Sequence, residues 1–439
     1  MKNKIVEKIH KSKESKVSIF CLIMVYKIII ELIYYVNISP IYDYSGLITE
    51  INYNKMIISN LLVLFVILIS PNNFKRASSY FYLFIEIFIF VPLLSFYWLA
   101  NESSNYVLFV TASFIVIASI LKIRLKHITI RNLNVKPFLE MFFYIYILIA
   151  LFLIIKRGGI DTRAFNFDTI YELRAENELI GIWGYMTNWV TKVFGPFFFA
   201  YNIYFNKKYK CVIVIFIQLL MYLSFGNKAF LFSIPLMLIC AYLISKKKFI
   251  KSFLSIFILT NISAHFLDVI FGIDFLRRAI PYRMIFVPAM IQFQHYDFFS
   301  NSTKLYFAEG LLGSIFGKTN PYGIPIPILI SRVYSGKFDS MAYSNTGIFA
   351  DAYYNGGFVM MILISILLAV ILYIIDSISF NIPVGITTGA FSYTFFVLND
   401  TGLFTTLLTG GMVIMIVLLL FMDSVIYVQN NNESRMKKL

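Results

Sequence analysis

Charged residues are scarce in this chain of 439 residues. They make up 14% of the sequence, and hydrophobic residues make up 59%, whereas a soluble domain is about one quarter charged. Apolar runs of roughly 17–22 residues recur along most of the chain, and such runs can cross a hydrocarbon core about 30 Å thick. The composition excludes a soluble domain, and the long runs exclude a β-barrel, whose strands would alternate apolar and polar residues. We therefore expect an all-α polytopic membrane protein.

Side chains that bind metals are also few, with 3 cysteines and 4 histidines in the whole chain. Cys21, Cys211 and Cys240 lie inside apolar runs without the spacing of metal ligands, so we expect packed, unreactive thiols. Asp43 and Glu50 are the only acidic residues of the first expected outer loop, and they lie seven residues apart. The sequence therefore predicts neither a metal site nor another cofactor.

Acidic residues are outnumbered, 23 against 38 lysines and arginines, which gives a net charge of +15. The basic residues form short blocks between apolar runs, a pattern that follows the positive-inside rule and predicts anionic lipid headgroups, not nucleic acid, as their partner. The basic start of the chain has no small-residue cleavage site, so we expect no cleaved signal peptide. Basic blocks at both ends predict that both termini are cytoplasmic.

Apolar runs and basic blocks together predict about twelve transmembrane helices in one domain over 1–439, without an internal repeat. The two longest expected outer segments are 156–180 and a loop at 271–350, between the ninth and tenth helices. The seventh and eighth helices look too short to span fully, so their junction should dip below the outer surface. The predicted helices cover 17–37, 55–70, 79–100, 105–121, 138–155, 181–205, 211–225, 229–245, 250–270, 351–375, 382–398 and 403–422.

Several basic residues are expected in the outer segments, where the positive-inside rule disfavours them. Ion pairing with nearby acidic residues is one explanation, and a cationic pocket for a diphosphate headgroup is the other, because a guanidinium matches phosphate oxygens. The cluster at 277–283 favours the pocket, since only Asp274 lies nearby to neutralise it. The residues concerned are Arg157, Arg163, Arg174, Lys228, Arg277, Arg278 and Arg283.

Two titratable residues stand out near the tenth predicted helix. Asp351 lies at its outer mouth, in "SNTGIFADAYYNGGFVMM", where it is either a helix cap or a reactive carboxylate. His295, in "IQFQHYDFFSN", is either a general base or part of a helix that rests on the membrane surface. Within the first predicted helix, Lys27 and Glu31 lie four residues apart and are expected to pair.

Three stretches together resemble the Wzy-type oligosaccharide repeat-unit polymerases, also called O-antigen polymerases. They are "SFGNKAFLFSIP", "RRAIPYRMIFVPAMIQFQHYDFF" and "NTGIFADAYYNGG", they occur in this order, and the last is the most specific. The resemblance covers about residues 155–360. It implies a GT-C-like membrane glycosyltransferase fold related to the O-antigen ligases. It also implies a metal-independent enzyme of the bacterial inner (cytoplasmic) membrane, which joins undecaprenyl-diphosphate-linked oligosaccharides into O-antigen or capsular polysaccharide at the outer face.

The resemblance also implies roles for single residues. Gly226, Asn227 and Lys228 match an element in which Arg is usual at the last position, and Lys weakens a bidentate phosphate contact. Asn345 stands where the ligases usually carry a His. Because Asn cannot act as a base, that role falls to Asp351 or His295.

The remaining implied roles concern substrate binding. The outward arginines would stabilise the departing lipid diphosphate and keep Asp351 ionised. Tyr296, Tyr353 and Tyr354 would stack on sugar rings. Implied partners are the undecaprenyl-diphosphate-linked oligosaccharides, membrane lipids and, as an option, a chain-length regulator.

Two alternatives stay open beside the polymerase. An O-antigen ligase is the nearest, and a flippase of lipid-linked oligosaccharide belongs to another class with about twelve helices. Intramembrane charges such as Lys27 and Glu31 also occur in transporters. Transporters usually show internal repeats and short loops on both sides. The absence of a visible repeat and the single long outer segment favour an enzyme.

Overall fold

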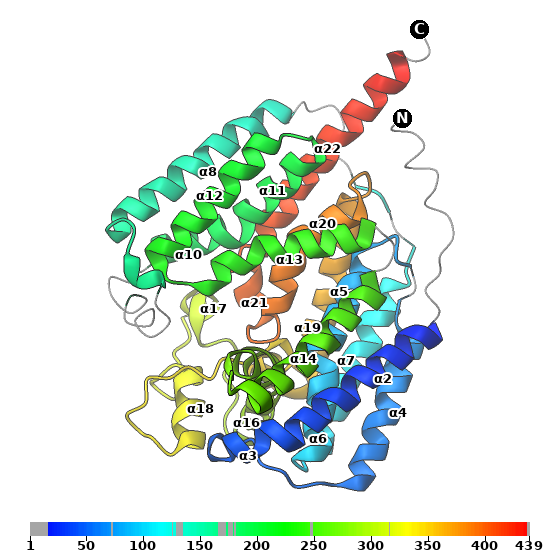
Figure 1. Cartoon of the computed structure of the whole chain (residues 1–439), viewed down its shortest axis with the longest axis vertical. Helices are drawn as coiled ribbons and strands as arrows, with labels where there is room; N and C mark the ends of the chain where they lie inside the picture. The colour runs from blue at the N-terminus through cyan, green and yellow to red at the C-terminus, as the bar shows by residue number, and fades with distance from the viewer. Residues whose placement is uncertain are drawn as a thin grey trace.

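Helices form all of the regular structure in the described part of the chain (Figure 1). The computed structural model describes residues 16–436 apart from 72, 125, 129–134, 166–172, 174–178, 180, 246–248 and 316. Within these residues, eight segments are long and apolar enough to cross a membrane, so the protein is an all-α, polytopic membrane protein, as its composition predicts. The eight segments are Lys16–Ser45, Ala77–Leu99, Ser104–Leu121, Lys136–Arg157, Lys208–Phe225, Phe249–Phe271, Ile348–Ile378 and Met412–Asn432.

Helical structure covers each of the twelve ranges predicted from the sequence, although the last range is broken. The two helical parts of this last range meet at Gly410 and Gly411. Gly411 has a φ of 78°, a backbone conformation that residues other than glycine rarely adopt. In the first half of the chain the helices are α2 (Lys16–Ile33), η1 (Tyr34–Ile38), α3 (Ser39–Tyr42), η2 (Asp43–Ser45), α4 (Tyr53–Ile69), α5 (Ala77–Ile85), η3 (Glu86–Phe90), α6 (Val91–Leu99), α7 (Ser104–Leu121), α8 (Lys136–Arg157), η4 (Thr162–Phe165), α10 (Ile182–Trp189), η5 (Val190–Phe194) and α11 (Gly195–Tyr204).

The second half of the chain contains the predicted long outer segment, and this segment is largely helical. Its helix α16 packs against α6 and α19, so part of the segment belongs to the protein core. The helices are α12 (Lys208–Phe225), α13 (Lys228–Ser245), α14 (Phe249–Phe271), α15 (Phe275–Arg277), η6 (Arg278–Phe286), α16 (Val287–Ser300), α17 (Gly310–Ile315), α18 (Ile326–Ser335), α19 (Ile348–Ile378), α20 (Val384–Val397), α21 (Leu403–Leu407) and α22 (Met412–Met436).

The expected shortness is wrong for the seventh helix, whereas the apolar part of the eighth that the structure describes, Ser233–Ser245, is short. Both α12 and α13 have 18 residues, and α12 is long enough to span. The prediction began the seventh helix at residue 211, after its lysines, because charges are costly in the membrane. Lys210 is nevertheless buried in the first turns of α12, where it and Lys207 form ion pairs with Glu140 of α8.

Four π-helical segments, η1, η3, η5 and η6, interrupt the helices, and each precedes a proline. The prolines are Pro40, Pro92, Pro196 and Pro288, each in the first two positions of the helix that follows. A proline inside a helix lacks an amide donor and clashes with the carbonyl four residues earlier, which a wider π turn relieves. The chain therefore stays helical through each proline, and runs such as α2–η1–α3 form one span.

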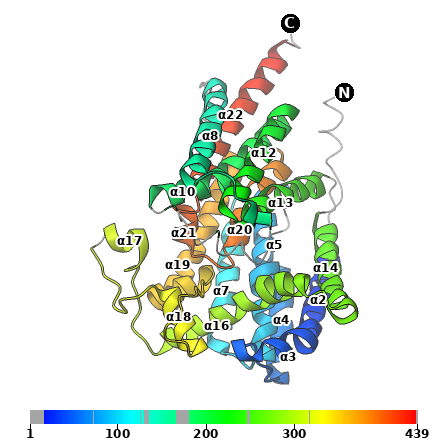
Figure 2. The ribbon, with the colours of Figure 1, turned by 60° about the vertical axis from the view of Figure 1, so that its left-hand side comes forward.

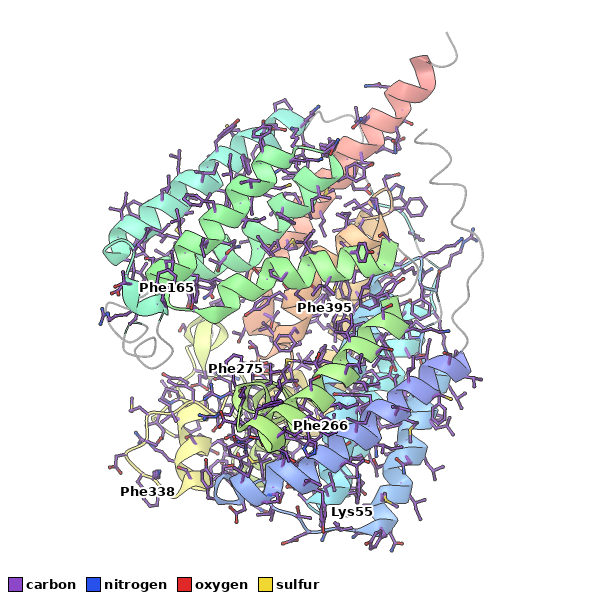
Figure 3. All side chains as sticks on the ribbon, viewed as in Figure 1. Lys55, Phe165, Phe266, Phe275, Phe338 and Phe395 are labelled. Carbon is purple, nitrogen blue, oxygen red and sulfur yellow. The ribbon has the colours of Figure 1, made fainter. Side chains whose placement is uncertain are left out.

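The helices form two groups that are joined through α13 and α20 (Figures 1 and 2). One group contains α8, α11, α12 and α22, and the other contains α2, α4, α5, α6, α7, α14 and α19. Helix α20 packs against α13 on one side and against α5 on the other. Where α20 meets α5, Phe395 stacks on Phe81 with ring centroids 3.9 Å apart. Phe395 lies near the centre of the molecule in Figure 3.

Candidate functional site

Helix α19 carries Asp351 in its first turn and bends one turn later. Gly356 and Gly357 leave the helical conformation, and Gly357 has a φ of 68°, a value that glycine adopts at little cost. The bend separates a first segment, residues 348–355, from the long remainder of the helix. The paired glycines of the sequence motif thus set the direction of the segment that bears Asp351.

The Asp351 carboxylate lies between one hydroxyl and one glycine. Tyr354 donates a hydrogen bond to its Oδ1 at 2.6 Å. On the other side is Gly402, where a Cβ atom would lie 2.5 Å from Oδ1, so a side chain at this position would displace the carboxylate. Asp351 is not a helix cap, because Gly347 occupies that position. No arginine of the described chain pairs with Asp351, which corrects the expectation that arginines hold its charge.

Backbone amides of residues 305–307 hold the bend in place, and we call this contact the 305–307 clasp. At a bend, helical carbonyls lose their usual donors and need others. Leu305 donates to the carbonyl of Tyr354, and Tyr306 donates to that of Asn355, each at 2.9 Å. Phe307 donates to the Asn355 side chain at 2.8 Å. The Asn355 amide in turn donates to the Asp351 carbonyl, so the clasp and the first segment form one unit.

His295 of α16 lies behind Tyr354, with ring centroids 5.8 Å apart. Its Nδ1 donates to the carbonyl of Ile291 at 2.9 Å, so Nε2 carries no proton, and Nε2 is buried without a hydrogen-bond partner. Burial lowers the pKa of His295 to about 4. The imidazole is therefore neutral at pH 7 and closed to solvent, an environment that suits support of Tyr354 better than contact with a substrate.

The tyrosines of the motif are packed among other rings. Tyr353 is 5% exposed, with Tyr296 at 4.9 Å and Phe358 at 5.0 Å between centroids. The ammonium of Lys304 lies 3.7 Å from the centre of the Tyr353 ring. The ring faces of Tyr353 are thus covered in this structure, and a sugar would have to displace Lys304 to stack there.

A second group of predicted residues lies around a cavity near the start of α13. The cavity has a volume of about 330 Å³, and its lining includes Arg157, Asn188 and Asn227. Arg157 is buried, donates to the carbonyl of Leu173, and lies 5.6 Å from the ring centre of Phe225. It also borders a smaller cavity of about 70 Å³. A buried guanidinium that faces two cavities is suited to an anionic ligand.

Other predicted residues of this region contribute less to the cavity. Arg163 forms an ion pair with Asp161 at 2.7 Å, as the pairing interpretation requires. Lys228 starts α13, but its side chain and all of Arg174 lie outside the described residues. Gly226, with a φ of 65°, ends α12 and lets the chain turn into α13.

The arginines at 277–283 differ from one another. Arg277 is buried and pairs with Asp268 of α14 at 3.0 Å as well as with Asp274, and Arg278 pairs with Asp274. The sequence did not indicate Asp268 as a partner of Arg277. Because the two residues form an ion pair, ion pairing and not a cationic pocket explains Arg277. Arg283 is exposed and has no ion pair within the described chain. Asn345 is also exposed, six residues before Asp351.

One segment connects the cavity with Asp351. It runs from residue 398 to 411 and contains α21, which lies between α10 and α19 in both views (Figures 1 and 2). At one end, Trp189 of α10 donates to the carbonyl of Thr409 at 3.1 Å. At the other end, the amide of Ile348 donates to the carbonyl of Leu398 at 3.1 Å. The cationic cavity and the carboxylate thus rest on the same short segment.

Three residues of this site were absent from the sequence prediction, Lys304, Asp400 and Gly402. The polar sequence "NDTG" at 399–402 interrupts two apolar runs, and this was the one available signal for the last two. Asp400 is accessible to solvent, yet desolvation by the surrounding protein raises its pKa to about 6.

The fold and the site define a class, a polytopic helical membrane protein with a carboxylate at the mouth of a bent helix and a buried arginine at a nearby cavity. No family model, no curated protein and no solved structure matches the chain. In the described part of the chain, no three His, Cys, Asp or Glu side chains come close enough to hold a metal ion together.

Proposed function

We propose that this protein is a repeat-unit polymerase, a glycosyltransferase that joins lipid-diphosphate-linked oligosaccharides at the outer face of a bacterial inner membrane. The observation that carries the proposal is the placement of Asp351. Its Oδ1 accepts the Tyr354 hydrogen bond, which orients the carboxylate, and its side chain is only half-buried. A fixed carboxylate within reach of an acceptor hydroxyl is what general-base catalysis of sugar transfer needs.

In the proposed reaction, an acceptor hydroxyl oxygen forms a bond to the anomeric carbon of the donor sugar. The bond between this carbon and the diphosphate oxygen breaks, and its electron pair leaves with the lipid diphosphate. Asp351 takes the proton of the hydroxyl. The negative charge that develops on the diphosphate needs positive groups nearby, and Arg157 at the cavity is the described residue best suited to supply one.

Segment 398–411 is consistent with these two roles, proton removal by Asp351 and charge stabilisation by Arg157. It contacts α10, which lines the cavity, and it presents Gly402 to Asp351. The donor diphosphate and the acceptor hydroxyl must meet at the same anomeric carbon, and segment 398–411 is the element that contacts both regions. The twelve-helix topology with both termini in the cytoplasm, which the basic blocks predict, belongs to the same proposal.

A deletion strain complemented with variants tests the proposal. Asp351→Asn keeps the size and hydrogen-bonding capacity of the side chain but removes its basicity. We expect single capped repeats without a long-chain ladder, since loss of a general base costs about 100- to 10,000-fold in rate. Asp339→Asn, at an exposed position apart from the residues that surround Asp351, is the matched control and should leave the ladder unchanged.

The deletion strain itself separates the alternatives. Loss of the ladder with one capping repeat retained supports a polymerase. Loss of every repeat on the acceptor would point to a ligase or a flippase instead. A normal ladder in the Asp351→Asn strain, with the variant present at wild-type level, would remove Asp351 from the mechanism.

A further inference from the structure

Lys304 is a half-buried cation whose ammonium has no carboxylate partner in the described part of the chain. Its ammonium donates to the carbonyl of Phe299 and lies over the Tyr353 ring, and no Asp or Glu of the described chain is within ion-pair distance. Desolvation lowers its pKa to about 8. Other buried lysines of this protein have carboxylate partners, Glu31 for Lys27 and Glu140 for Lys210. Removing a cation from water without such a partner is costly.

The position of Lys304 connects it with the candidate site. It directly precedes the 305–307 clasp, and its Cε lies beside the bend of α19, 3.9 Å from where a Cβ of Gly357 would be. Asp351 lies six residues before this glycine in the same helix. An ammonium has three hydrogen-bond donors and the Phe299 carbonyl uses one, so the Lys304 ammonium beside the bend of α19 has two donors left for a ligand.

We infer that Lys304 anchors a subsite for an oxyanion, the carboxylate of an acidic sugar, on the saccharide that reaches Asp351. The identity of the ligand as a saccharide rests on the proposed function. The ligand would take up the uncompensated charge and draw the ammonium away from Tyr353, which would open one face of that ring to a sugar. The chemistry is shared with phosphate, so the lipid diphosphate is the competing source of the anion.

Lysine reactivity tests this inference without any need for catalysis. The full-length protein in lipid nanodiscs is treated with an amine-reactive reagent near pH 8, and modification of each lysine is quantified by mass spectrometry. The probes are a disaccharide that contains glucuronate, its neutral counterpart with glucose, and geranyl diphosphate. Lys318 is the internal control, because it also bonds a carbonyl and lies near a tyrosine ring, but is exposed.

We expect the glucuronate disaccharide to protect Lys304 and the glucose disaccharide to leave it reactive. At a probe concentration ten times the dissociation constant, modification should fall to about one tenth, with Lys318 unchanged. Protection by geranyl diphosphate alone would overturn the assignment to a saccharide, and no protection by either anion would overturn the subsite. Failure of the polymerase proposal would show separately, as an unchanged glycan ladder in the deletion strain.

A variant pair provides a second measurement. Lys304→Gln should lose binding of the glucuronate disaccharide in nanodiscs, whereas Lys318→Gln should keep it. Lys304→Arg keeps the positive charge and should retain part of the affinity. Equal binding by Lys304→Gln and the wild type would refute the inference.

Discussion

Replacement of Gly402 by alanine is the sharpest test of how Asp351 is held. The backbone at Gly402 has φ −67° and ψ 157°, which alanine adopts without strain. The new methyl group, however, would lie 2.5 Å from Oδ1 of Asp351, about 1 Å short of the 3.4 Å at which ordinary contact begins. The substitution therefore acts on the carboxylate and leaves the fold unchanged.

The magnitude follows from this displacement. A shift of about 1 Å in a catalytic group costs about 100-fold in rate, and the shift also breaks the hydrogen bond from Tyr354. Purified Gly402→Ala should polymerise lipid-linked repeats about 100-fold more slowly, while its thermal unfolding midpoint stays near that of the wild type. Thr405→Ala, at an exposed position of α21, is the matched control and should behave as the wild type.

A double-mutant cycle with Asp351→Asn decides whether the reasoning is right. Both substitutions act on the same carboxylate, so their effects should be strongly non-additive. The double variant should be about as slow as Asp351→Asn alone. If Gly402→Ala slows the Asp351→Asn protein by a further 100-fold, Gly402 acts through something other than Asp351, and the proposed contact is irrelevant to activity.

Three further predictions concern charge, pH and topology. Arg277→Met should lower stability by up to about 3 kcal/mol, because it leaves the half-buried Asp268 without its arginine partner. Arg283→Met should slow polymerisation without a change in unfolding midpoint, and the opposite pattern would contradict both assignments. The pKa of His295 is about 4 in the folded protein and about 6.5 when unfolded, so its contribution, up to about 3 kcal/mol, is present above pH 6.5 and is lost as the pH falls toward 4. The unfolding midpoint of the wild type should therefore fall relative to that of His295→Gln as the pH is lowered from 6.5 to 4, and parallel curves would contradict this account. In a background without native cysteines, Asp339→Cys should react with an impermeant reagent in spheroplasts and Arg124→Cys should not; reversed labelling would end the functional proposal.

Hydropathy predicted where the helices lie, but it did not predict how polar residues enter them. Lys210 was excluded from its helix because its partner, Glu140, lies on another helix 70 residues earlier. The pair of Lys27 and Glu31 was predicted, because a spacing of four places both side chains on one helical face. Local spacing can be read from a sequence, whereas contacts between distant helices cannot.

The candidate site shows the same limit. The hydrogen bond from Tyr354 to Asp351 spans three residues and could have been inferred from helical spacing. Gly402 approaches the carboxylate from 51 residues away, and the sequence indicates only that a polar turn is present there. Asp268 is nine residues from Arg277, but the end of α14 must be placed before the two can be paired.

The 305–307 clasp has a consequence for how readily this site can change its ligand. Residues 305, 306 and 307 contribute only their backbone amides to the hydrogen bonds of the clasp. These hydrogen bonds to α19 therefore do not depend on which side chains the three residues carry. Tyr306 and Phe307 even adopt positive φ values, which asparagine or glycine would tolerate better. The exposed side chain of Tyr306 can therefore be exchanged while Asp351 keeps its position. Such a scaffold would allow the ligand preference proposed for this site to change by point substitution, without moving the proposed catalytic carboxylate.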